Sequence, residues 1–203
     1  MQTISATPDD VLDFWFGRGD HDRQVIDDRH ALWFGGSPEI DREVERRFGG
    51  LIAQAADGRL GSWLEIARGR LAAIIVLDQF PRMIWRGRVE AFAHDTQARQ
   101  WTREGIDLGH DMQLRLIERV FFYMPFEHSE SIDDQRASLA LYGGLTRAAP
   151  LGQRDLYAEH LKQAQRHHDV IARFGRFPQR NALLGRESTA EEIIYLGSPE
   201  GDW

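Results

Sequence analysis

The sequence predicts an all-α fold, and two observations lead to this class. Helix start and stop signals recur along the chain, with only short segments between them. No segment alternates apolar and polar residues over the length of a strand between hairpin turns. With 203 residues, of which 42% are hydrophobic, the chain can bury one core without disulfides or bound metals to stabilise it. We therefore expect a single all-α domain over residues 1–203.

The first helices are predicted by proline at their start. Residues 8–17 begin with Pro8 after a threonine cap, carry acidic residues in the first turn and reach a glycine. The same signal opens a second helix at Pro38, which an apolar stripe continues to Ile52. Gly49 and Gly50 cost this helix about 1 kcal/mol each, so a bend or an end is expected there. For residues 17–36 we predict an ordered, packed loop with one helical turn at most.

Capping boxes and prolines bound the later helices. Ser62 and Glu65 predict the start of a strongly apolar helix, which Pro81 stops near residue 79. The last helix is expected to begin with a second box at Ser188 and Glu191. Between these, the signals predict helices over 95–109, 112–123, 131 to just before Pro150, and 154–174. Short joints make antiparallel helical hairpins the expected arrangement.

Composition narrows the classes of function. Cysteine is absent, which excludes disulfides, thiol chemistry and Cys-ligated zinc. A net charge of −7 argues against a nucleic-acid partner. The longest apolar run, Leu71 to Leu77, is too short to span a membrane, and residues 1–17 lack the pattern of a signal peptide. We expect a cytoplasmic protein that binds neither nucleic acid nor membranes.

Polar side chains gather at helix ends near three Pro-containing stretches. They follow the apolar helix at Asp78, the next proline at Pro125, and the long helix at "RFGRFPQRN". A further histidine, His167, lies on the apolar face of the long helix, as does His160. The candidates for catalysis are His128, His167 and Glu127. The candidates for ligand binding are Arg82, Glu127, His128, His167, Arg176, Arg180 and Asn181.

Metal, nucleotide and nucleophile motifs are not found. His160 and His167 stand two turns apart, too far for the adjacent-turn pair of a helical metal site. A core histidine bonded to a carbonyl is the favoured interpretation of each. The sequence has no Gly-x-Ser-x-Gly, phosphate loop or dinucleotide fingerprint. We expect neither a metal nor a cofactor.

Three interpretations of the polar cluster remain open. Arginines that pair with Asp78, Glu127 and Glu130 would join helix ends, a purely structural role. In a binding module, the same residues would line a pocket or groove for a peptide or a small anionic ligand. In an enzyme acting on a small polar metabolite, a histidine and a glutamate would carry acid–base chemistry, with an arginine holding an anion. We rank the binding module slightly above the enzyme. The oligomeric state is not predicted.

Several long strings make the chain resemble one family. They are "VLDFWFG", "LDQFPRMIWRG", "AFAHDTQA", "PFEHSE" and "HHDVIARFGRFPQRNALLGREST". Over Val11 to about Leu196, the chain resembles the bacterial domain-of-unknown-function family numbered 924. The resemblance implies an all-α right-handed superhelix similar to tetratricopeptide repeats, and it brings no established activity.

The resemblance also implies a set of signature positions. Gln179 departs from the family pattern, which commonly has a histidine there. If the family used that histidine as an acid or base, this chain would lack it. The signature positions are Asp78, Gln79, Phe80, Pro81, Arg82, Glu127, His128, His167, Arg176, Phe177, Pro178, Arg180 and Asn181.

Overall fold

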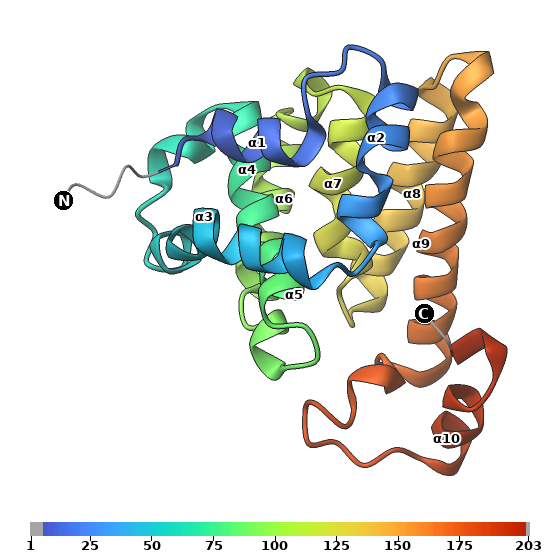
Figure 1. The fold of residues 1–203 in the computed structure, drawn as a ribbon. Helices are drawn as coiled ribbons and strands as arrows, with labels where there is room; N and C mark the ends of the chain where they lie inside the picture. The colour runs from blue at the N-terminus through green and yellow to red at the C-terminus, as the bar shows by residue number, and fades with distance from the viewer. Residues whose placement is uncertain (1–5, 202–203) are drawn as a thin grey trace.

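A computed structural model describes residues 6–201, and the fold is all-α, as predicted (Figure 1). No strand occurs within these residues. The α-helices are α1 (Pro8–Phe16), α2 (Asp22–Phe34), α3 (Pro38–Ala56), α4 (Ala67–Asp78), α5 (Phe80–Ile84), α6 (Asp95–Asp107), α7 (Leu116–Glu127), α8 (Ile132–Ala148), α9 (Arg154–Phe174) and α10 (Ala190–Leu196). Short 3-10 helices span Gly61–Glu65, Val89–Phe92, Asp111–Gln113, Leu151–Gln153, Pro178–Arg180 and Pro199–Gly201. Residues 1–5, part of the stretch in which we predict no signal peptide, lie outside the described residues.

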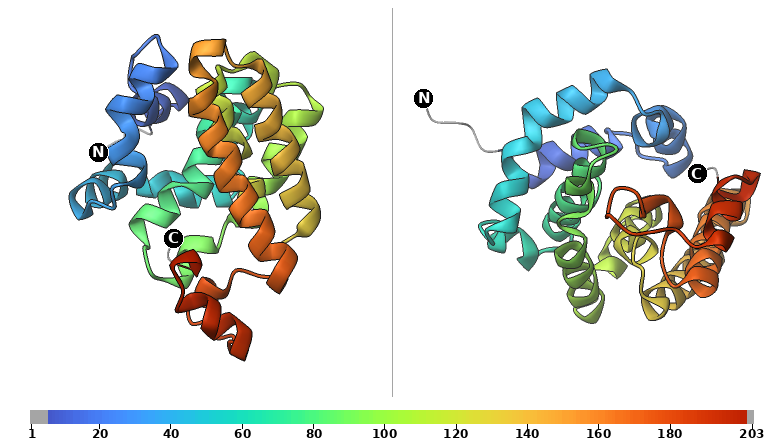
Figure 2. Two further views of the ribbon diagram at one scale, coloured as in Figure 1. Left: turned by 90° about the vertical axis from the view of Figure 1, so that its right-hand side faces the viewer. Right: turned by 90° about the horizontal axis from the view of Figure 1, so that it is seen from below.

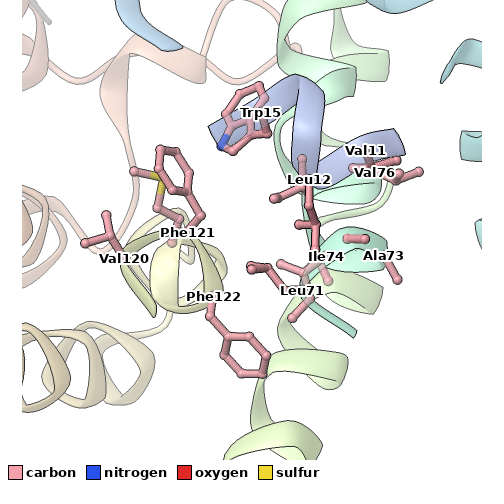
Figure 3. Packing of buried hydrophobic residues seen from close by; sticks show 14 of the residues in the cluster. Val11, Leu12, Trp15, Leu71, Ala73, Ile74, Val76, Val120, Phe121 and Phe122 are labelled. Atoms are coloured by element: carbon pink, nitrogen blue, oxygen red, sulfur yellow. The ribbon is translucent and has the colours of Figure 1, made fainter. Parts of the chain in front are cut away.

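Helix α4 forms the centre of the core. Its segment Leu71–Leu77 is buried throughout, because α1, α3, α6 and α7 pack around it. A helix that is apolar on all sides needs such a position. Figure 3 shows α1 and α4 contributing side chains that face Phe121 and Phe122 of α7. Trp15 of α1 meets Phe121 edge to face, with ring centroids 5.3 Å apart.

Successive helices pack side by side on the carboxyl-terminal side of the molecule. Helix α8 lies against both α7 and α9, and α9 extends along the edge in orange in Figure 1. Helix α10 lies beyond the end of α9, at one end of the molecule (Figure 2). The tetratricopeptide-like superhelix and the single domain remain predictions. No helix within residues 6–201 is both long and apolar enough to cross a membrane.

The predicted loop at 17–36 is wrong, because most of it forms the helix α2. Its sequence shows little amphipathic pattern, and Val25 is its one fully buried residue. Contacts with distant parts of the chain hold it instead. Asp22 accepts hydrogen bonds from Arg115 (2.7 Å) and from the Tyr157 hydroxyl (2.5 Å), and Trp33 donates to the carbonyl of Trp15 (3.0 Å). Local propensity is overridden here by tertiary packing.

Helix α7 continues past the point where Pro125 was expected to prevent it, and ends at Glu127. A proline inside a helix removes one backbone hydrogen bond and pushes against the preceding turn. Hydroxyl groups from neighbouring helices bind the carbonyls on either side of that of Phe121, the one whose backbone donor Pro125 removes. Tyr142 donates to the carbonyl of Val120 (2.9 Å), and Thr102 donates to that of Phe122 (3.1 Å). The helix therefore carries Glu127 inward.

Smaller differences concern helix ends. The Ser62 box does not start α4, since residues 61–65 form a 3-10 turn and α4 begins after Ile66. Gly49 and Gly50 lie within α3, which runs on to Ala56. Thr189 caps α10, one residue after the expected Ser188. Helix α9 spans the predicted range and ends at Gly175, whose φ of 69° is the left-handed conformation that glycine adopts most readily.

Candidate functional site

A cavity of about 660 Å³ lies between α2, the α4–α5 junction, α7 and α9. This volume lies in the range of small-molecule pockets. Its apolar wall consists of Trp15, Ile26, Trp33, Phe34, Met83, Met124 and Leu156. Its polar wall consists of His30, Gln79, Arg82, Arg86, Glu127, His128, Asp155, Glu159, His160, Gln163 and His167.

Asp78 and His128 form a hydrogen-bonded pair beside this cavity. Asp78 ends α4, is fully buried and accepts a hydrogen bond from His128 Nδ1 at 2.8 Å. Gln79 Nε2 donates to its other oxygen at 2.6 Å. Burial alone would raise the pKa of Asp78, but His128, Arg82 and these hydrogen bonds outweigh it and lower the pKa to about 2. Asp78 is therefore a carboxylate.

The carboxylate fixes the tautomer of the His128 ring. An ionised Asp78 can only accept, so the proton lies on Nδ1 and the lone pair of the neutral ring lies on Nε2. Burial, followed by the charge of Arg82, lowers the pKa of His128 although Asp78 opposes this. No hydrogen bond joins Nε2 to another residue within 6–201, and the ring lines the cavity. His128 thus has the arrangement of an oriented general base.

Glu127 and His167 lie next to this pair. His167 Nδ1 donates to the carbonyl of Gln163 at 2.9 Å and lies 3.1 Å from Glu127 Oε1. The His128 and His167 ring centroids are 6.5 Å apart. Burial raises the pKa of Glu127 to about 8, against a smaller opposing effect of the Tyr142 hydroxyl. Burial also lowers the pKa of His167 to about 3. At neutral pH a protonated Glu127 and the neutral rings of His128 and His167 therefore line the cavity.

Arg82 lines the cavity, but carboxylates already occupy its guanidinium. It forms a two-pronged ion pair with Asp95, at 2.8 and 2.9 Å, and donates to the carbonyl of Asp78 at 2.7 Å. Arg180 lies 3.9 Å from the same Asp95 and stacks on the ring of Phe177. Arg180 is not among the residues that line the cavity.

Comparison with known proteins places the chain in a family. A family model described as "Bacterial protein of unknown function (DUF924)" matches residues 11–200. The chain belongs to the DUF924 family. A solved structure of a protein of unknown function, ATU0120 from Agrobacterium tumefaciens, is 37% identical and has a TM-score of 0.78. The similarity covers 93% of this chain and 96% of that chain. No curated protein matches.

Arg176 and Asn181, two further candidates from the polar clustering in the sequence, also lie away from the cavity. Arg176 forms an ion pair with the buried Glu192, at 2.6 and 2.8 Å, and also donates to the carbonyl of Glu187. Asn181 donates to Ser188 and to Glu192. Both side chains hold the start of α10 by binding the carboxylate of Glu192. Arg176, Arg180 and Asn181 are therefore not among the residues that line the cavity.

Most of the apolar wall in this DUF924 chain was not predicted from the sequence. Ile26, His30 and Trp33 lie four and three residues apart on α2, a helical spacing that would have placed them on one face. His160, interpreted as a core histidine, lines the cavity and stacks on Tyr142. Within residues 6–201, no three His, Asp or Glu side chains are grouped so as to hold a metal ion.

Proposed function

We propose that this cavity is the active site of an enzyme that transfers protons to and from a bound small molecule. The observation that carries the proposal is the Asp78–His128 hydrogen bond, 2.8 Å long, at a cavity that Glu127 also lines. Two titratable groups whose environments push their pKa values in opposite directions are the usual mark of an acid–base pair. Burial raises the pKa of Glu127 and lowers that of His128.

The roles follow from the protonation states. His128 Nε2 takes a proton from a water molecule or from a hydroxyl or amine of the substrate. Glu127, which is protonated at neutral pH, gives its proton to the leaving group or to the substrate atom that becomes negatively charged. Solvent then carries the proton from His128 back to Glu127. None of the described residues that line the cavity is Ser, Thr, Cys, Tyr or Lys. With His128 as the base and Glu127 as the acid, water or a group of the substrate itself is the attacking species in this proposal.

The arrangement supports a small-molecule site over a peptide groove. Helix α2 contributes Ile26, His30, Trp33 and Phe34 to the wall, and its amino-terminal end is tied to Arg115 and Tyr157 through Asp22. An extended peptide would need an open groove along the inner helix surfaces. A small molecule needs only the volume present.

The test is a turnover screen with matched variants. Wild-type protein and His128→Asn are incubated with a panel of chromogenic esters, amides, glycosides and phosphate esters. We expect hydrolysis of at least one class, reduced about 100-fold or more in the variant, because general base catalysis contributes on that order. Activity should rise with pH through the lowered pKa of His128 and fall above about 8, where Glu127 loses its proton. Turnover that His128→Asn leaves unchanged contradicts the proposal.

A binding function without turnover is the second candidate, and one observation favours it. His160 and Gln163 extend the polar wall along α9, so polar side chains there exceed what acid–base chemistry alone requires. A probe that stabilises the protein against heat, yet is recovered unchanged after long incubation, would favour this function over the enzyme.

A further inference from the structure

We propose that the cavity takes an uncharged amphiphilic molecule, with a neutral polar head at the His128 end and an aromatic or alkyl body, and that it rejects anions. This inference names the ligand class of the site proposed above and therefore rests on that proposed function. It also departs from the anionic ligand expected from the sequence. Three structural observations support it: the pairing of every arginine in the wall, the direction of two helix ends, and the neutral donors and acceptors nearby.

The arginines that line the cavity are both paired with carboxylates. Arg82 binds Asp95 through both terminal nitrogens, and its Nη1 lies 3.4 Å from the Asp78 carboxylate. Arg86 binds Asp41 at 3.2 and 3.3 Å. An anion recognised by a guanidinium needs its donor fork, and these forks already hold carboxylates. An anionic ligand would therefore have to displace an existing ion pair.

Carboxylates at the rim are likewise matched by cations. Asp155 lies 3.3 Å from Arg23, and Glu159 lies 3.6 Å from Lys162. An ammonium group on the ligand would compete with these side chains, just as an anion would compete for the arginines. The charges around the cavity are thus balanced in pairs, and neither sign of ligand charge finds an unmatched partner.

Two helices point their carboxyl-terminal ends toward the polar wall. Helix α4 ends at Asp78, and α7 ends at Glu127. The carboxyl-terminal end of a helix carries a partial negative charge from its aligned carbonyl groups. Arg82 donates to the carbonyl of Asp78 and Gln135 to that of Glu127, and the remaining negative potential of the two ends disfavours a ligand carboxylate or phosphate. The exclusion of a ligand ammonium rests on the paired carboxylates of Asp155 and Glu159 alone.

The side chains that can bind a head group are neutral at pH 7 and together offer a donor and several acceptors. Gln79 and Gln163 donate to Asp78 and Glu159 through their amide nitrogens, and their amide oxygens can accept. Glu127 retains its proton, because burial raises its pKa to about 8. His128 contributes Nε2. An amide, ester or hydroxyl head can satisfy such groups, whereas the aromatic wall of Trp15, Trp33 and Phe34 suits a flat or alkyl body.

The experiment uses three probes that share one body and differ in head charge: 4-phenylbutanamide, 4-phenylbutanoate and 4-phenylbutylamine. Binding to the full chain at pH 7 is measured by calorimetry. We expect the amide to bind at least tenfold more tightly than either charged probe. Phe34→Ala should weaken amide binding several-fold, since Phe34 lines the cavity. The matched control Leu108→Ala, at an exposed site outside the wall, should leave binding unchanged.

A second variant tests the reason for the preference. Asp95→Asn removes the partner of Arg82, so butanoate binding should tighten several-fold while the fold, checked by circular dichroism, is retained. Wild-type protein that binds the butanoate or the amine as tightly as the amide overturns the inference. Failure of all three probes to bind at 10 mM, on the order of the weakest useful affinity, overturns it too. Turnover lost in His128→Asn would still uphold the proposed function in either case, so the two failures are distinguishable.

Discussion

Glu127 should make the free energy of unfolding depend strongly on pH, because its carboxyl group releases its proton at a higher pH in the folded protein than in the unfolded chain. Burial raises its pKa from 4.5 to about 8 in the folded chain. Between these values the folded state binds one proton more than the unfolded state, so its contribution to stability is complete below about 4.5 and is lost as the pH rises toward 8. At about 1.4 kcal/mol per pH unit, the interval sets an upper limit of roughly 5 kcal/mol.

Glu127→Gln should remove this loss, since glutamine has nearly the same shape and no proton to release. The free energy of unfolding in urea is measured at pH 5, 7 and 9 for the wild type, for Glu127→Gln and for the matched control Glu45→Gln, an exposed site on α3. We expect the wild type to lose several kcal/mol relative to Glu127→Gln between pH 5 and pH 9. If the free energy of unfolding of the wild type and that of Glu127→Gln depend equally on pH, the assignment of a buried, protonated Glu127 is refuted.

Further predictions concern the contacts that hold the site. Asp78→Asn leaves Arg82 and His128 with a neutral neighbour, and it should cost about 3 kcal/mol in a urea titration, as breaking a buried ion pair does. Arg176→Ala removes the charged partner of Glu192; we expect a loss of about 1–3 kcal/mol and faster trypsin cleavage after Arg180 and Arg186, with unchanged binding of 4-phenylbutanamide. Asp22→Asn weakens the anchor of α2, so amide binding should fall several-fold in calorimetry. A variant of Asp22 with wild-type affinity would show that α2 needs no such anchor.

Local signals were sufficient for helices whose pattern is strong. Helix α9 matches its predicted range because its apolar face is regular and Gly175 ends it. Helix α2 could not be predicted in this way. The partners that hold Asp22 lie 93 and 135 residues away, and no local pattern reports them. Pro125 misled for the same reason, since the hydroxyls that support its turn come from α6 and α8.

The residue types that line the cavity were predictable from the sequence, but their geometry was not. Clustering at helix ends pointed to Glu127 and His128, and helical spacing on the long helix pointed to His167; the structure brings these three to one cavity. The same clustering pointed to Arg176, which a nearer carboxylate on α10 holds instead. Whether an arginine faces the cavity or a carboxylate on a neighbouring helix depends on how the helices pack, and a single sequence does not report this packing.

The cavity has a consequence for how the chain reaches its working state. Its walls come from Trp15 and α2 near the amino terminus and from α9, whose His167 is contributed late in the chain. Contacts this distant in sequence form slowly, because a long loop has to close before they yield any energy. An emerging chain that lacks α9 has no complete pocket, so a bound probe would report that both halves have docked. Ligand added during refolding should accordingly stabilise only the finished fold, and not its amino-terminal portion.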